Sequence, residues 1–346
     1  MAIAPAHSPY IHVRQNWLYK APREVILHPD LPIVDPHHHL WDRADWRYML
    51  PDLLADTNSG HNIVATVFVQ CRAFHRAGGP EEMRPVGETE FVNGVAAMSA
   101  SGEYGPTKIC AGIVGHANLA LGARVQDVLE AHIGAGGGRF RGIRHITAWD
   151  ADPSLLNPNY PMPQGLLADK IFREGFSRLA PLKLSFDAWL YHPQIGEVTD
   201  LARAFPETKI VLDHIGGPLA IGGYEGKRAE IFPVWRAAIR ELAKCPNVHV
   251  KLGGIGMRIN GYGFEQQPAP PSSQQLADAW KPYIDTCIEA FGPSRGMFES
   301  NFPVDKGSYG YAAYWNACKR LTSGASAAER ADLFAGTAAR FYRLDL

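Results

Sequence analysis

The sequence predicts an α/β fold, a single (β/α)8 TIM barrel that need not be regular, and three observations support this prediction. Eight short runs rich in β-branched and apolar residues recur between residues 33 and 303, and segments with helical spacing lie between most of them. Such alternation is typical of parallel strands joined by right-handed crossovers, and eight repeats favour a closed barrel over an open sheet. No break in composition along the 346 residues indicates a second domain.

The predicted elements follow one another regularly along the chain. The strands are 33–40, 63–71, 109–116, 140–146, 182–190, 209–215, 248–252 and 296–303. The helices between them are 86–100, 123–133, 165–179, 197–205, 231–243 and 274–291, and 309–321 and 327–342 close the barrel. Segments rich in Gly and Pro at 102–106, 152–163, 217–226 and 260–273 are expected to be loops, and the last is long enough to act as a lid.

This pattern divides the chain into two parts. Residues 1–30 are expected to form an N-terminal extension wrapped on the barrel. Residues 31–346 are expected to form one barrel domain that includes the closing C-terminal helices.

Composition excludes several classes of function. The 34 basic and 35 acidic side chains give a formal net charge of -1, so no basic field attracts nucleic acid or an anionic membrane. No apolar run reaches the roughly 18 residues that a membrane span needs, and residues 1–10 do not resemble a secretory signal. Five cysteines without a CxxC spacing indicate free thiols and a cytoplasmic location. A small acidic molecule is the expected partner, and a homo-oligomer is compatible with the sequence.

The first predicted strand ends in a cluster of histidines. Asp35, His37 and His39 share one parity, and a strand sends alternate side chains to one face. His37 and His39 should therefore project together from the strand end. Two imidazoles at this spacing can share a metal ion or bind one anionic substrate, whereas an isolated pair of this kind is more often structural.

Other predicted strand ends carry polar residues as well, and in a (β/α)8 barrel the chemistry lies at the carboxyl ends of the strands. These residues are His116, Arg144 and His145, Tyr191 and His192, Asp213 and His214, and Glu299 and Asn301. Histidines at five strand ends that meet on one rim predict a functional site there.

Five motifs resemble the amidohydrolase-related superfamily. They are DPHHHLW at 35–41, GIRH at 142–145, LDHIGGP at 212–218, VKLGG at 250–254 and MFESNFPV at 297–304. More narrowly, the chain from about residue 30 onward resembles the branch that holds 2-pyrone-4,6-dicarboxylate lactonase, L-fuconolactonase and sulfomuconolactone hydrolase. The resemblance implies a barrel hydrolase that opens lactones or related cyclic esters of small carboxylic acids. Members of this branch either hold one divalent ion or work without a metal.

One position departs from the pattern of this branch. The family usually has Gly-Ser-Asp-Trp-Pro at the last strand, where this chain has Glu299 to Pro303, so Asn301 stands at the Asp position. An amide cannot take a proton from water and is a poorer metal ligand than a carboxylate. Glu299 shares the parity of Asn301 and could supply the missing carboxylate, or it could instead pair with Lys251.

The metal site is expected to use His37, His39 and His192, with Asn301 or Glu299 completing the set. No lysine stands where a carboxylated bridge on the fourth strand would be needed, which argues against a binuclear centre. The expectation is one divalent ion, zinc among the candidates, that is weakly held, or no required metal.

Catalytic roles follow from the chemistry of lactone hydrolysis, which needs a base for water and a group that polarises the carbonyl. His214 is the candidate general base, with Glu299 as the next candidate. Arg144 suits a substrate carboxylate through its bidentate fork, although a salt bridge in the barrel wall is the alternative. Asp213 is expected to orient a neighbour. The substrate is also expected to contact His116, Tyr191 and Trp41.

Other activities remain open at this point. A metal-dependent nonoxidative decarboxylase of an aromatic or unsaturated acid, or a lactone isomerase, would use a similar set of strand ends. A barrel that binds a small acid without turnover is the third alternative, and Asn301 mildly favours it. Loop residues set specificity in this fold, and the loops here do not identify a substrate.

Overall fold

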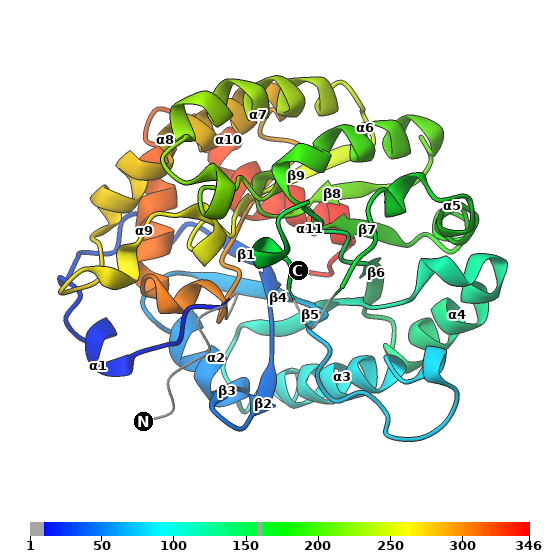
Figure 1. Ribbon diagram of the computed structural model, residues 1–346. Coiled ribbons are helices and arrows are strands. Elements are labelled where there is room, and N and C mark those ends of the chain that lie inside the picture. Colours follow the sequence, from blue (N-terminus) through cyan, green and yellow to red (C-terminus); the bar gives the residue numbers. More distant parts are fainter. Residues whose placement is uncertain (1–9, 158–160) are drawn as a thin grey trace.

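Eight parallel strands form one sheet that curves into a nearly closed barrel in the computed structural model of the chain, which describes residues 10–157 and 161–346 (Figure 1). The strands are β1 (Ile33–His38), β4 (Ile63–Val69), β5 (Lys108–Gly115), β6 (Phe140–Arg144), β7 (Ser185–Ala188), β8 (Ile210–Leu212), β9 (Val248–Gly253) and β10 (Gly296–Glu299). Each strand pairs in parallel with the next in this order. The predicted (β/α)8 fold is thus confirmed.

The barrel closes where β10 meets β1. The backbone N–H of His39 donates to the carbonyl of Phe302 at 2.8 Å, and the N–H of Asn301 donates to the carbonyl of His37 at 2.9 Å. The backbones of His37, His39 and Asn301 thus form the seam where the first and last strands end.

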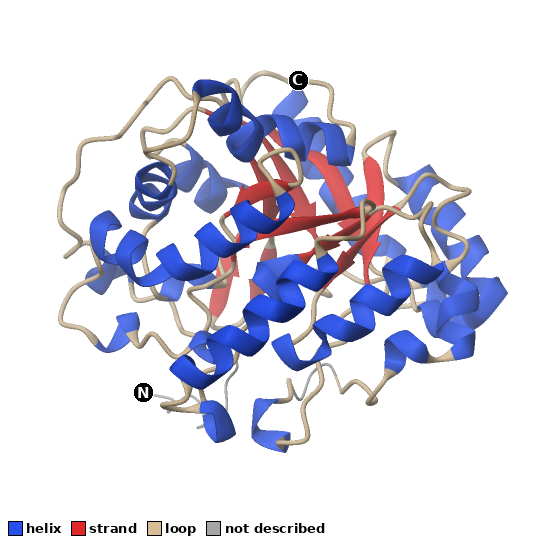
Figure 2. Cartoon of the chain, turned by 90° about the horizontal axis from the view of Figure 1, so that it is seen from above, coloured by secondary structure: helices blue, strands red, loops and turns tan. Residues whose placement is uncertain are grey.

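Helices surround the strands on the outside, as Figures 1 and 2 show. They are α1 (Gln15–Leu18), α2 (Leu50–Thr57), α3 (Val86–Ala100), α4 (Val125–Ala135), α5 (Lys170–Phe176), α6 (Ile195–Ala204), α7 (Arg228–Leu242), α8 (Ser273–Phe291), α9 (Tyr311–Leu321), α10 (Ala327–Ala331) and α11 (Thr337–Tyr342). Local sequence sets several boundaries. Ser272 and Gln275 form a capping box at the start of α8, and Gly292, with a φ of 72°, ends it.

The lower part of the barrel is apolar and is closed by the C-terminal helix. Small and β-branched side chains from the strands pack inside it together with Ala338, Phe341 and Tyr342 of α11. The strand residues of this cluster are Val34, Ala65, Val67, Val69, Val114, Val211 and Met297. Close packing of these side chains fixes the strand positions, and hence the positions of the groups at the opposite, open end.

Several strands end earlier than the sequence predicted. β8 stops at Leu212 because the next residues enter a tight turn in which His214 and Ile215 have φ values of 55° and 50°. β10 stops at Glu299, and Asn301 follows with a φ of 55°. The polar residues of these two strand ends therefore lie partly on turns, where the alternation of side chains along a strand no longer determines their direction.

Smaller elements surround the first strand. A hairpin of β2 (Trp41–Arg43) and β3 (Trp46–Tyr48), which the sequence analysis did not predict, follows β1. Strands of three residues are too short to show periodicity. In the N-terminal segment, Trp17 Nε1 donates to the carbonyl of Gln267 at 2.8 Å, and the N–H of Leu27 donates to Asn316 Oδ1 at 2.9 Å. The division at residue 30 stays a prediction, and its residues 1–9 lie outside the described residues.

Within the described ranges, none of the helices combines the length and the apolar character that crossing a membrane requires.

Candidate active site

A cavity of about 80 Å³ lies at the carboxyl ends of the strands. Six residues that the sequence analysis selected line it, namely His39, Trp41, Arg144, Tyr191, His214 and Asn301. Apolar and aromatic side chains complete its wall, among them Trp189, Met257 and Ile259. The cavity thus combines bases, a cation and an amide within an apolar wall, an arrangement that is typical of small-ligand sites.

Three histidines lie together at this end of the barrel. The ring centroid of His37 is 5.0 Å from that of His39 and 4.5 Å from that of His214. His39 Nδ1 is 2.7 Å from the carbonyl of Val69, so this nitrogen carries the proton and Nε2 is the acceptor. Burial and the nearby Arg144 lower the pKa of His39 well below its usual value. His39 is therefore a neutral ring at physiological pH.

Glu299 joins two of these rings from beneath. Its Oε1 accepts from His214 Nδ1 at 2.6 Å and from the His214 backbone N–H at 3.1 Å. Its Oε2 lies 2.7 Å from His37 Nδ1 but is buried without a well-oriented hydrogen bond. Burial by itself would raise the pKa of Glu299, but His214 and His37 lower it to about 2. The carboxylate is thus ionised and fixes the Nδ1 proton of His214, which leaves His214 Nε2 as an acceptor.

Lys251 forms the next layer of the barrel. Its Nζ is 2.6 Å from Asp187 Oδ2 and 3.0 Å from Asp213 Oδ1, and all three groups are fully buried. Asp187 Oδ2 also accepts from the hydroxyl of Tyr342 in α11 at 2.7 Å. The salt bridges of Lys251 are thus to the two aspartates, and Glu299, its alternative partner from the sequence, is bonded to His214 instead.

Arg144 occupies the space between these layers. Its Nη1 lies 3.2 Å from His37 Nε2 and 3.6 Å from Asp213 Oδ2, and its Nη2 donates to the carbonyl of Gln70 at 2.5 Å. Asp213 therefore sits between Lys251 and Arg144, which, with His214, lower its pKa despite its burial. This arrangement holds the Arg144 guanidinium at the cavity wall.

The buried charges in this region do not cancel. Asp187, Asp213 and Glu299 are three carboxylates, and Lys251 and Arg144 are two cations, so the cluster carries one negative charge when all five are ionised and the histidines are neutral. Burial raises the pKa of Asp187, but only to about 6, so the group is still ionised at neutral pH. This net charge favours a further cation here, whereas burial and the nearby Lys251 lower the pKa of His37 well below its usual value.

Glycines make room for the His214 ring. A Cβ on Gly254, which has a φ of +63°, would lie 2.1 Å from His214 Nδ1. A Cβ on Gly253 would lie 2.1 Å from the carbonyl of Glu299. His214 and Asn301 both have left-handed backbones, a strained conformation that clusters at functional sites. The two glycines of the VKLGG motif thus permit the close approach of His214 and Glu299.

The described residues include one cluster with the spacing of a metal site. His37, His214 and Glu299 each offer one ligand atom, and these atoms lie within 4.8 Å of one another. Two imidazoles and a carboxylate are a suitable donor set for zinc and similar divalent ions, and Glu299 Oε2 is buried without a well-oriented partner. The residues present fit such an ion. This cluster shares His37 and Glu299 with the predicted set and contains His214 where that set has His39 and His192.

The remaining candidates lie outside the cavity. His192 Nδ1 accepts from the N–H of Leu219 at 3.2 Å, and its ring packs against Tyr224. His116 Nδ1 lies 3.2 Å from the carbonyl of Arg144, and its ring packs against His145. Neither His116 nor His192 lines the cavity.

Aromatic side chains hold the cavity histidines in place. Trp41 stacks on His39 with ring centroids 5.7 Å apart, and Tyr191 donates its hydroxyl to the carbonyl of Leu155 at 2.6 Å. Trp189, which was not selected from the sequence, meets the His214 ring edge-on at 4.7 Å. Its position at the end of the fifth predicted strand could have identified Trp189 as a residue of the site.

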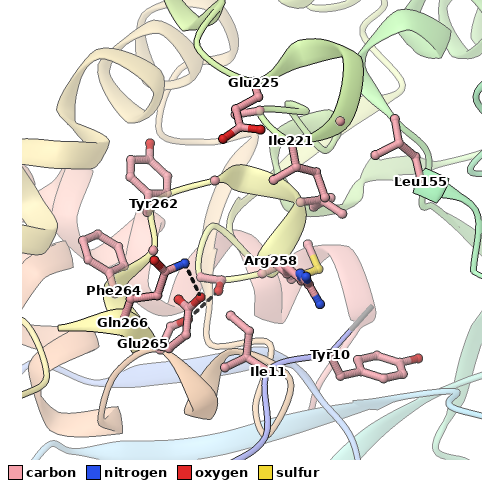
Figure 3. Close-up of a pocket in the computed structure, with 18 of the residues that line it drawn as sticks. Tyr10, Ile11, Leu155, Ile221, Glu225, Arg258, Tyr262, Phe264, Glu265 and Gln266 are labelled. Carbon is pink, nitrogen blue, oxygen red and sulfur yellow. Dashed lines mark hydrogen bonds between the residues drawn. The ribbon is translucent and has the colours of Figure 1, made fainter. Parts of the chain in front are cut away.

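A groove of about 1100 Å³ adjoins the cavity (Figure 3). Tyr10, Met257 and Ile259 line both spaces. Figure 3 shows Arg258 within the groove, with Tyr262 and Glu225 farther along its wall. Part of the segment predicted as a lid, residues 260–273, forms one side of this groove.

Comparisons with known proteins agree with this architecture. The chain is 34% identical to an uncharacterised protein of Sinorhizobium fredii over 337 residues, which cover 91% of this chain and 99% of that protein. It is 27% identical to an L-fucono-1,5-lactonase of Burkholderia multivorans over 333 residues, which cover 90% of this chain and 96% of the lactonase. A crystal structure of an amidohydrolase from Burkholderia multivorans with bound zinc has a TM-score of 0.70 at 27% identity, with 90% of this chain and 99% of that chain covered. The amidohydrolase family model matches residues 34–344. The chain therefore belongs to the amidohydrolase family and is an enzyme of that family.

Proposed function

We propose that this enzyme hydrolyses a lactone, or a related cyclic ester of a small carboxylic acid, with water activated by His214. The observation that carries the proposal is the His214–Glu299 pair, whose Nδ1–Oε1 distance is 2.6 Å, at the wall of a cavity that also contains Arg144. The similarity to L-fucono-1,5-lactonases supports the same class of reaction.

His214 is the general base in this proposal. Its Nε2 takes a proton from water, and the Glu299 carboxylate stabilises the imidazolium that forms and holds the ring in one tautomer. After the water oxygen has added to the lactone carbonyl, the same proton passes to the alkoxide oxygen that leaves when the ring opens. The low pKa of Glu299 keeps its charge in place throughout.

Arg144 and His39 line the same cavity as His214. The guanidinium is suited to the carbonyl oxygen as charge develops there, or to a carboxylate of the substrate. His39 and Trp41 form a stacked pair that fixes this part of the wall. A cavity of about 80 Å³ holds a small ring or a few water molecules. We assign the adjoining groove to the part of the substrate that does not react.

We further propose that a divalent ion, with zinc as the first candidate, binds weakly at His37, His214 and Glu299, or that none is required. A bound ion would act as a Lewis acid and lower the pKa of water. Ligation through His214 Nδ1 would leave the ring proton on Nε2, so this role of His214 and its role as a base exclude one another. Lys251 Nζ, 3.0 Å from His37 Nδ1, also competes for that nitrogen.

The test is a panel of sugar, muconic and pyrone lactones, which includes L-fucono-1,5-lactone, beside metal analysis of the purified protein. The expected result is stoichiometric release of acid and ring-opened product from at least one lactone, with the activity lost in a His214→Asn variant. Carbon dioxide release from an aromatic acid without opening of any lactone would replace the proposal with the decarboxylase alternative.

A further inference from the structure

Asn301 and Asp305 form a buried pair at the edge of the cavity. Asn301 lines the cavity, and its Nδ2 donates to Asp305 Oδ1 at 3.0 Å. Both side chains are buried, and Asp305 itself is fully enclosed. The pair joins the turn after β10 to the loop that follows β9, because Asp305 Oδ2 accepts from the backbone N–H of Gly256 at 2.9 Å.

The partners of Asp305 determine which end of the Asn301 amide faces the cavity. Asp305 Oδ2 accepts from Gly256 and from the hydroxyl of Tyr309 at 2.5 Å, so its Oδ1 is the atom that faces Asn301. Burial raises the pKa of Asp305, but only to about 6, so the carboxylate is still ionised at neutral pH and can only accept. Only the NH2 group of Asn301 can therefore face Asp305, and Oδ1 of the amide is left for the cavity.

We propose that Asp305 is a positioning residue that holds the Asn301 amide so that Asn301 Oδ1 accepts a hydrogen bond from the attacking water. This inference rests on the proposed hydrolysis. The water then has two acceptors in the same cavity, His214 Nε2 for the proton that is transferred and Asn301 Oδ1 for the proton that stays. Two fixed acceptors direct a lone pair of the water oxygen away from both, which is the orientation that attack on a carbonyl needs.

An aspartate at position 301 would not replace the amide in the presence of Asp305. The variant Asn301→Asp places two buried carboxyl groups at the 3.0 Å separation of the present pair. Like charges at this distance cannot both ionise, so one of the two must be protonated, and neither position is fixed as the donor. The amide and the carboxylate thus function as a unit. Which of positions 301 and 305 holds the amide determines which hydrogen-bonding group faces the cavity.

Three variants test the positioning role of Asp305. In Asp305→Asn, the new amide must keep its oxygen toward the Gly256 N–H, so its NH2 faces Asn301 and forces that amide to turn its own NH2 into the cavity. We expect kcat on the fastest lactone of the panel to fall by roughly 10- to 100-fold with KM changed less than about threefold, the range for one lost hydrogen bond in a transition state. The reversed pair, Asn301→Asp with Asp305→Asn, restores an acceptor to the cavity and should recover most of kcat, whereas Asn301→Asp alone should not.

Tyr309→Phe is the matched control, because it removes a hydrogen bond to Asp305 Oδ2 and leaves the atom that faces Asn301 unchanged. It should lower Tm and keep kcat within about threefold of the parent. Full turnover in Asp305→Asn, or a reversed pair no more active than Asp305→Asn, would overturn the proposal. If Asp305→Asn does not fold, the comparison of the reversed pair with Asn301→Asp decides, since rescue of kcat by the reversal is expected only from a positioning role.

A second readout does not depend on turnover. In protein labelled with 15N at asparagine, the side-chain NH2 of Asn301 should exchange slowly with solvent in the parent, where it faces Asp305, and quickly in Asp305→Asn, where it faces the cavity. Slow exchange in both proteins would contradict the positioning role, whereas absence of lactone opening by the parent with the expected exchange pattern would contradict only the proposed function.

Discussion

Two groups of histidines lie near the carboxyl ends of the strands, and they differ in their partners. His37 and His214 each approach an oxygen of Glu299, at 2.7 and 2.6 Å. His145 and His192, in contrast, accept hydrogen bonds from the backbone N–H groups of Leu119 and Leu219. Members of both groups are buried to a similar degree. Burial at a strand end is therefore insufficient to identify a reactive histidine, and a carboxylate partner separates the two groups.

The pKa values do not separate the two groups, because burial lowers the pKa of His37 well below its usual value as well. Burial lowers the pKa of His145 and of His192 to about 4, which keeps both rings neutral at physiological pH. A neutral ring bonded to the backbone holds a loop in place. The feature that separates the groups is the contact itself: Glu299 lies 2.6 Å from His214 Nδ1, and a carboxylate at this distance favours the imidazolium that a general base forms.

The largest effect on kcat is expected when His214 is replaced, and replacing one histidine of the other group provides the comparison. His214→Asn should lower kcat by about 100-fold or more, the range for losing a general acid–base group, with a smaller change in the affinity for the product acid. His192→Asn is the matched control and should keep kcat within about threefold of the parent. Steady-state kinetics on one lactone will measure both. Equal losses in the two variants would remove the distinction between the groups.

Glu299→Gln should have the next largest effect. The amide oxygen can still accept from His214 Nδ1, but the charge that stabilises an imidazolium is gone. We expect kcat to fall by roughly 10- to 100-fold, since charge-assisted hydrogen bonds are about twice as strong as neutral ones. If kcat is unchanged while Tm falls, Glu299 serves only to hold the rings.

Metal content tests the same cluster in another way. We expect the parent to retain less than one equivalent of divalent ion after chelator treatment, and Glu299→Gln to retain less than the parent, because a neutral oxygen replaces a charged ligand. Elemental analysis and lactone turnover before and after the treatment will measure both effects. A full equivalent of metal that survives chelation in the parent would contradict weak binding.

The same elemental analysis tests position 301. Asn301→Asp should raise metal affinity more when Asp305→Asn accompanies it, since the second change removes the competing carboxylate. A gain in the single variant that equals or exceeds the gain in the pair would show that Asp305 does not oppose a carboxylate at this position.

The smallest effect on activity is expected at His145, where the readout is stability. Its pKa in the folded protein is about 4, below the usual 6.5, so the unfolded chain binds the proton more readily between these values. The contribution of His145 to the free energy of unfolding is therefore fully present above pH 6.5 and is lost as the pH falls toward 4. His145→Asn should reduce this slope by up to about 1.4 kcal/mol per pH unit, the value for one proton, with kcat unchanged. Urea unfolding at several pH values will measure it, and an unchanged slope would refute the assignment.

Much of the fold was predictable because strand and helix periodicities are local properties of the sequence. The placement of His39, His214 and Arg144 at one cavity follows from the rule for strand ends in barrels. The pairing of Glu299 with His214 could not be derived, because the residues are far apart in sequence and meet only after His214 takes a left-handed backbone. The direction of the His192 side chain could not be predicted from strand alternation either, since this residue begins a helical turn rather than ending a strand.

The floor of the barrel bears on how the enzyme is made in the cell. Tyr342 of α11 donates to Asp187, which in turn bonds to Lys251 beneath His37. Because α11 follows all eight strands in the chain, the ribosome releases it after them. Until this helix docks, the buried charges beneath the cavity are open to water from below, and a nascent chain that already has every cavity-lining residue cannot yet enclose them.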